Sequence, residues 1–165
     1  MTRTTLHPIR SHRARPSRSA GFTLAEMMLT MAIAALLATV AVPSFRNLTA
    51  NQAVRVTGTE VFAALMRTRS EALAHNSNYT LQPAGAGWTA GWQIVDVNGN
   101  VVEARGATSG LNIAGPANVV YRASGRLPAG NAPQFVLTST MNGNIAYCVS
   151  VDLSGRPYSK TGNAC

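Results

Sequence analysis

The segment Phe22–Val42 contains 21 residues, and Glu26 is the only charged residue among them. A helix of that length spans about 30 Å, the thickness of the hydrocarbon core of a bilayer. The first 25 residues contain no acid but five arginines, Arg3, Arg10, Arg13, Arg15 and Arg18. Because basic residues that flank an apolar segment stay in the cytoplasm, we expect the rest of the chain to face outward.

A carboxylate inside an apolar helix is costly in lipid and marks a functional contact. Gly21–Glu26, with the sequence Gly-Phe-Thr-Leu-Ala-Glu, resembles the processing site of type IV prepilins and pseudopilins. The resemblance implies that a prepilin peptidase cuts after Gly21 and methylates Phe22, and that Glu26 assists subunit docking in a filament. A plain signal anchor and an ordinary secretory signal are the alternatives.

Removal of a leader, residues 1–21, leaves a transmembrane or filament-core helix at 22–49 and a globular domain at 50–165. The chain without its leader carries nine basic and six acidic side chains, a net charge of +3. Residues 104–165 hold five of the basic side chains and a single acid, Asp152. The end of the chain that we expect to face outward is therefore its basic end.

Two cysteines, Cys148 and Cys165, lie near the C-terminus. In an oxidising compartment such as the periplasm, an even pair most simply forms one disulfide. Metal binding by two cysteines at this spacing is not favoured, because no histidine follows His75. The sequence thus predicts a disulfide and indicates neither a metal nor another cofactor.

Helical patterning resumes after Pro43, with apolar or small residues at steps of three and four. We therefore expect one helix from about Thr23 to about His75. Seven short strand-like runs follow, and Asn98-Gly99 indicates a two-residue hairpin between the second and the third. The runs are Tyr79–Gln82, Trp92–Val97, Val101–Ala104, Leu111–Ile113, Val119–Arg122, Phe135–Thr138 and Ile145–Val151. This order predicts an α+β fold, in which the long helix packs on an antiparallel β-sheet or a small β-sandwich.

Several motifs after residue 60 narrow the resemblance to the FimT/GspH type of minor pilin and pseudopilin. They are Met66–Ala72 leading into Tyr79–Leu81, Trp88–Trp92, Asp96–Gly99, Val119–Arg126, and the series Cys148, Gly155-Arg156 and Cys165. The resemblance implies a subunit that works by assembly, with other pilin subunits, the assembly platform and the prepilin peptidase as partners. Its expected location is the inner membrane, with the C-terminal domain in the periplasm, and then a pilus at the cell surface.

The residues give no support to catalysis, since the part after the leader has one histidine, His75, and no paired acids for general acid–base work.

The basic residues of the distal half are the better candidates for a functional site, because arginines on loops can reach phosphates. FimT-like pilins are implicated in DNA capture through a Gly-Arg-x-Arg element. In this chain Gly155-Arg156 is followed by Pro157-Tyr158, so a tyrosine stands where the second arginine of that element would be. The candidate DNA-binding residues, acting independently of DNA sequence, are Arg156, Lys160, Arg126, Arg122 and Tyr158.

Two functions remain open. The first is a type IV minor pilin that contributes to pilus assembly and DNA uptake in natural transformation. The second is a minor pseudopilin of a type II secretion system. The basic distal half favours the pilus. The alternative interpretation is that these arginines are solvated surface residues without a function in binding.

Trp88 and Trp92 are expected in the core rather than on a binding platform.

Overall fold

The computed structural model describes residues 21–130 and 132–165, so most of the predicted leader lies outside the described residues. The chain divides into two units, Met1–Thr39 and Val40–Cys165. Helix α1 (Leu24–Ala74) continues through Pro43, and its bounds confirm the predicted helix to within one residue at each end. Residues 21–49 are all exposed, and Ala50 is the first buried residue of α1. By length and composition, α1 could cross a membrane.

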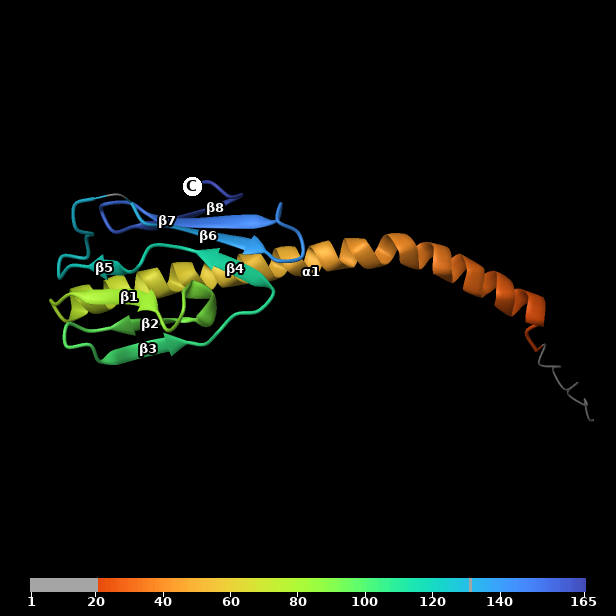
Figure 1. Ribbon diagram of the computed structural model, residues 1–165, viewed down its shortest axis with the longest axis horizontal. Helices are drawn as coiled ribbons and strands as arrows, with labels where there is room; N and C mark the ends of the chain where they lie inside the picture. The colour runs from red at the N-terminus through yellow and green to blue at the C-terminus, as the bar shows by residue number, and fades with distance from the viewer. Residues whose placement is uncertain (1–20, 131) are drawn as a thin grey trace, which may run out of the picture. The chain divides into compact units, whose positions relative to one another are not determined.

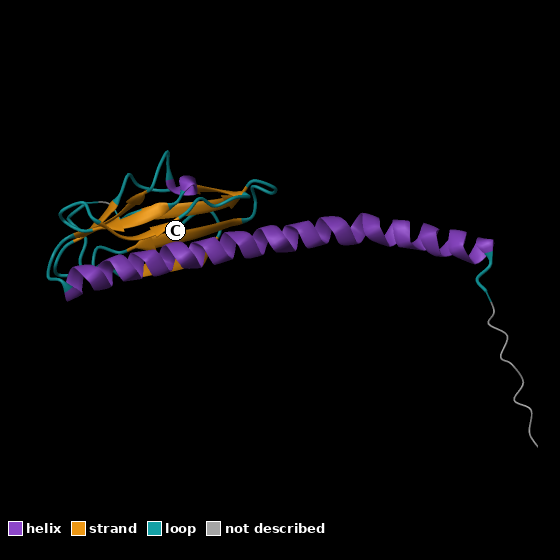
Figure 2. Ribbon diagram, turned by 90° about the horizontal axis from the view of Figure 1, so that it is seen from below, coloured by secondary structure: helices purple, strands orange, loops and turns teal. Residues whose placement is uncertain are grey.

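The strands of the described residues form two antiparallel sheets of four (Figure 1). The first sheet has the order β3-β2-β1-β5 and contains β1 (Tyr79–Pro83), β2 (Trp92–Val95), β3 (Val101–Arg105) and β5 (Val119–Tyr121). The second has the order β4-β6-β7-β8 and contains β4 (Leu111–Ala114), β6 (Gln134–Ser139), β7 (Ala146–Val151) and β8 (Pro157–Thr161). The second half of α1 lies along these sheets (Figure 2), which confirms the α+β fold.

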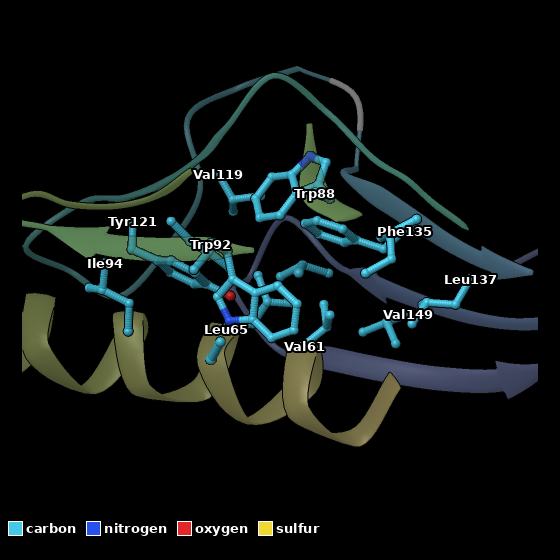
Figure 3. Packing of buried hydrophobic residues seen from close by; sticks show 14 of the residues in the cluster. Val61, Leu65, Trp88, Trp92, Ile94, Val119, Tyr121, Phe135, Leu137 and Val149 are labelled. Atoms are coloured by element: carbon cyan, nitrogen blue, oxygen red, sulfur yellow. The ribbon is translucent and has the colours of Figure 1, made fainter. Parts of the chain in front are cut away.

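The hydrophobic core joins the second half of α1 to both sheets. Leu65 of α1, Tyr121 of β5 and Phe135 of β6 are completely buried. Figure 3 shows Val61 and Leu65 directed from the helix into the same cluster. A short 3₁₀ helix, η1 (Trp88–Ala90), adds an indole that meets the Phe135 ring edge-on at 4.7 Å between centroids.

Both tryptophans belong to this core. Trp88 and Trp92 are each 4% exposed, and the indole nitrogen of Trp88 donates a hydrogen bond of 2.7 Å to the carbonyl of Pro116. A buried indole N–H with a partner is the usual arrangement for tryptophan in a protein interior. The expectation of a core role, rather than a binding platform, is confirmed.

One local prediction is wrong, and one strand is missed. The connection between β2 and β3 is a three-residue loop rather than a two-residue turn, because Asp96 N–H donates to the carbonyl of Asn100 and Gly99 N–H donates to the carbonyl of Asp96. Gly99 has a φ of 85°, as the closing glycine of such a loop requires.

The sequence analysis also misses strand β8, whose exposed, mostly polar residues lack the apolar alternation of a half-buried strand.

Gly58 sets the distance between α1 and the second sheet. A β-carbon at this position would overlap the ring of Tyr147 on β7, with Cε1 at 2.7 Å. We expect Gly58→Ala to lower the free energy of unfolding by about 1–3 kcal/mol, since overpacking exceeds the gain of up to about 1 kcal/mol in helix propensity. Thermal or denaturant unfolding of the detergent-solubilised chain measures the change.

Gly143→Ala is the matched control, because a β-carbon at Gly143 would meet nothing within 4 Å. It should leave the unfolding midpoint unchanged. If Gly58→Ala instead raised the midpoint, the contact between Gly58 and Tyr147 would not fix the spacing of helix and sheet.

Candidate functional site

The predicted processing site lies in an exposed, non-helical segment. Residues 21–23 are exposed, and α1 begins only at Leu24. Among the residues that the structure describes, a β-carbon on Gly21 would meet nothing within 4 Å. The bond between Gly21 and Phe22 is therefore accessible to another molecule.

Glu26 is held by a capping box at the start of α1. The N–H and the hydroxyl of Thr23 each donate to Glu26 Oε2 at 3.1 Å, and the N–H of Glu26 donates to Thr23 Oγ1 at 3.2 Å. Such reciprocal bonds satisfy two N–H groups that the first helical turn leaves free. Sequence reasoning missed this role of Thr23, although the spacing Thr-x-x-Glu is its known signature.

The first half of α1 exposes large apolar side chains. Phe22, Leu24 and Leu36 are 78%, 79% and 71% exposed, and no residue between 21 and 49 is buried. A contiguous apolar surface of this size requires lipid or apolar side chains of other proteins as a cover. The arrangement fits a helix that crosses a bilayer or packs among other helices.

Two loops in the second unit are built alike and end in the same three residues, Ser-Gly-Arg. In the loop after β5, Arg122 N–H donates to the carbonyl of Arg126 and Gly125 N–H donates to that of Arg122. In the β7–β8 loop, Asp152 N–H donates to the carbonyl of Arg156 and Gly155 N–H donates to that of Asp152. We call these loops the twin turns, 122–126 and 152–156. Sequence reasoning saw both glycine–arginine pairs but not their common geometry.

The twin turns touch each other. A β-carbon on Gly155 would overlap the carbonyl oxygen of Gly125 and would lie 3.2 Å from the ring of Tyr121. Gly125 in turn packs on Leu73 of α1. Because Gly125 and Gly155 have φ angles of 69° and 85°, the left-handed region that favours glycine, both close approach and backbone conformation require glycine here.

Arg69 of α1 bridges the twin turns. Its Nε donates to the carbonyl of Gly125 at 3.1 Å, and its Nη2 lies 3.5 Å from the carbonyl of Ser154. The side chain is half-buried and binds backbone rather than an acid. Sequence reasoning did not single out Arg69. Its position four residues after Leu65 and three before Ala72, both buried, places it near the face of α1 that packs on the sheets.

The arginines of the twin turns point their charge to solvent. Arg122, Arg126 and Arg156 are all exposed, and the structure therefore brings three of the five predicted DNA-binding residues to one place. Asp152 is the acid of these turns, and hydrogen bonds from the Ser154 hydroxyl and from Arg156 N–H lower the pKa of its carboxyl. Its charge offsets one of the arginines.

Tyr158 and Lys160 lie on β8 rather than on the turns. Lys160 Nζ donates to the carbonyl of Cys165 at 2.8 Å and lies 5.9 Å from the centre of the Tyr158 ring. Cys165 is joined to Cys148 of β7 by a disulfide, with 5.6 Å between the Cα atoms. The lysine is thus engaged with Cys165, and Arg156, directly before β8, connects Tyr158 and Lys160 to the twin turns.

No group of three or more metal-ligating side chains occurs among residues 21–130 and 132–165. Glu60, Glu71 and Glu103 instead form ion pairs. Arg105 binds Glu60 at 2.8 Å, and Arg67 binds Glu71 at 2.7 Å. The Arg105–Glu60 pair ties edge strand β3 to α1, whereas within the described residues the arginines of the twin turns form no ion pair with an acid.

Known proteins of two kinds share this fold. The type IV minor pilin FimU of Pseudomonas aeruginosa is 18% identical with a TM-score of 0.60, and the match covers 68% of this chain and 94% of FimU. The minor pseudopilin EpsH of the type 2 secretion system of Vibrio cholerae is 8% identical with a TM-score of 0.53, covering 66% and 96%. At these identities the likeness concerns the fold alone. Comparison with curated proteins finds no significant match.

Two family models match the sequence. The prokaryotic N-terminal methylation motif covers residues 16–42, which include Gly21, Phe22 and Glu26. The model of the type II transport protein GspH covers residues 57–155, more than half of the chain, from the buried part of α1 into the second twin turn. The chain therefore belongs to the GspH family and is a minor pilin or pseudopilin of a type IV pilus or a type II secretion system.

Proposed function

We propose that the protein is a minor pilin of a type IV pilus system that contributes to pilus assembly and to sequence-independent DNA uptake in natural transformation. The observation that carries the proposal is the gathering of exposed Arg122, Arg126 and Arg156 on two touching turns. Guanidinium groups on a rigid base are suited to phosphates, and neutralising several phosphates gives affinity without reading the bases.

Assembly would depend on the first half of α1. After cleavage of the leader, residues 22–49 would leave the inner membrane to pack in the filament core. Glu26 would offer its carboxylate to the amine of Phe22 in a neighbouring subunit. This charge pair would replace the capping bonds from Thr23 that satisfy the carboxylate in the single chain. The protein would work by assembly rather than by catalysis.

The location follows from the same proposal. The globular domain, residues 50–165, would face the periplasm before assembly and the cell exterior afterwards. The prepilin peptidase, other pilin subunits and the assembly platform would be its protein partners. Display of the twin turns on a pilus would bring their arginines to extracellular DNA.

DNA binding is tested with the full chain in detergent, by fluorescence anisotropy with two duplexes of unrelated sequence. We expect micromolar or weaker affinity for both, with a log–log salt slope near −3 for about three neutralised phosphates. Arg156→Gln should weaken binding to both duplexes and make the slope shallower by about one unit.

Arg55→Gln is the matched control, because Arg55 is an exposed arginine of α1 whose Nε donates to Asn51 of the same helix. It should change neither affinity nor slope. Absence of binding at low salt, or equal losses from the two variants, would contradict a DNA site at the twin turns.

A minor pseudopilin of a type II secretion system is the second candidate, and the description of the matching GspH family favours it. The two functions differ in what deletion of the gene abolishes. Loss of transformation with normal protein secretion supports the pilus. Loss of secretion with normal transformation supports the pseudopilus.

A further inference from the structure

We infer that the twin turns act as one rigid surface that binds two phosphates of a nucleic-acid backbone through Arg126 and Arg156, and that Arg69 is the positioning residue that unites them. The inference rests on the proposed function. It differs from that proposal because it attributes affinity to the contact between the turns, in addition to the number of arginines.

The two arginines occupy equivalent positions. Each follows the left-handed glycine of a three-residue loop, so each side chain leaves its turn at the same point. The loop Asp96–Asn100 has the same hydrogen bonds and the same glycine geometry, but it ends in Asn100. Since a loop of this build does not require arginine, the charge at Arg126 and Arg156 is not explained by turn formation.

The contact between the turns fixes the backbone positions from which both arginine side chains extend. A β-carbon on Gly155 would meet both the carbonyl of Gly125 and the ring of the buried Tyr121. Arg69 holds the carbonyls of Gly125 and Ser154 from α1. Binding groups that are fixed in advance lose less entropy when the ligand arrives, which raises affinity without a further contact.

Arg69 contributes position rather than a contact to phosphate. Arg69 is half-buried as a residue and its guanidinium donates to backbone carbonyls, whereas Arg126 and Arg156 are exposed. Removal of Arg69 should therefore weaken binding without changing the number of phosphates that the protein neutralises. The salt slope, which reports that number, separates these two roles.

Gly155→Ala tests the contact between the turns at constant charge. A methyl group at this position overlaps the carbonyl oxygen of Gly125 and strains a φ of 85°, so the turns must separate. We expect DNA affinity of the full chain to fall roughly tenfold, with the salt slope unchanged. Gly143→Ala is the control at an unstrained glycine with open surroundings, and it should bind like the unchanged chain.

Arg69→Met tests the positioning role and covers the case in which Gly155→Ala fails to fold. Without DNA, the amides of Gly125 and Gly155, which donate hydrogen bonds inside the turns, should exchange with deuterium faster than in the unchanged chain. DNA affinity should fall roughly tenfold at an unchanged salt slope. Arg55→Met removes the same charge from the same helix and should alter neither exchange nor affinity.

The outcomes distinguish this inference from the proposed function. Loss of binding in Arg156→Gln, with full binding in Gly155→Ala and Arg69→Met, overturns the single-surface inference and leaves DNA binding intact. Unchanged exchange in Arg69→Met overturns the positioning role. No binding by the unchanged chain overturns both, and binding of an acidic protein in place of DNA would assign the surface to a different partner.

Discussion

Gly21→Glu is expected to leave the chain uncleaved and unmethylated. The family resemblance implies a peptidase that cuts after glycine, and the N-terminal methylation motif matches residues 16–42. Residues 21–23 are exposed and non-helical, so the bond to be cut is accessible in the folded chain. Intact-mass measurement of the membrane-extracted protein should show loss of residues 1–21 plus one methyl group in the unchanged chain, and the full length in the variant.

The structure makes this variant easy to interpret. A β-carbon on Gly21 would meet no atom of the described residues within 4 Å, so a loss of processing would come from recognition and not from misfolding. Gly143→Glu adds the same charge at another open glycine and should be processed normally. Detection of a mature N-terminus other than Phe22 in the unchanged chain would refute the assignment of the cleavage site.

Phe135→Ala is expected to lower the free energy of unfolding by about 3–5 kcal/mol. The ring is completely buried, meets Trp88 edge-on, and lies against Gly115, where a β-carbon would be 2.7 Å from Cδ1. Trp88 is held by its bond to Pro116 and cannot move easily to fill the space. Because a domain is stabilised by only about 5–15 kcal/mol in total, the loss should be visible as a large shift in denaturant midpoint.

Phe45→Ala is the matched control, since the Phe45 ring on α1 is 66% exposed. The same substitution there should change the free energy of unfolding by no more than about 0.5 kcal/mol. Equal losses from the two variants would mean that Phe135 does not belong to the stabilising core.

Local signals allowed the long helix to be predicted closely. Apolar residues recur at helical spacing from Val54 to Ala72, and the structure buries both of these residues against the sheets. Pro43 does not end α1, as expected. The strands β1 to β7 correspond to the seven predicted runs. These runs could be recognised in the sequence because each contains at least two apolar residues near a turn signal.

Strand β8 could not be found in the same way. Tyr158, Ser159 and Lys160 are exposed on the edge of the sheet, so burial imposes no apolar alternation on them. Their strand conformation comes from pairing with β7, as in the register of Cys148 with Lys160. A local pattern carries no information about such a partner.

The sequence by itself determined the apolar anchor, the processing motif with Glu26, the long helix and the class of fold, because these depend on composition and on spacing within one element. Only the tertiary structure decided that Arg126 and Arg156 lie on touching turns. One turn follows β5 of the first sheet and the other joins β7 to β8 of the second, and Arg69 reaches both from α1. Contacts between residues so distant in the chain arise only when helix and sheets pack around one core, since no short-range periodicity encodes them.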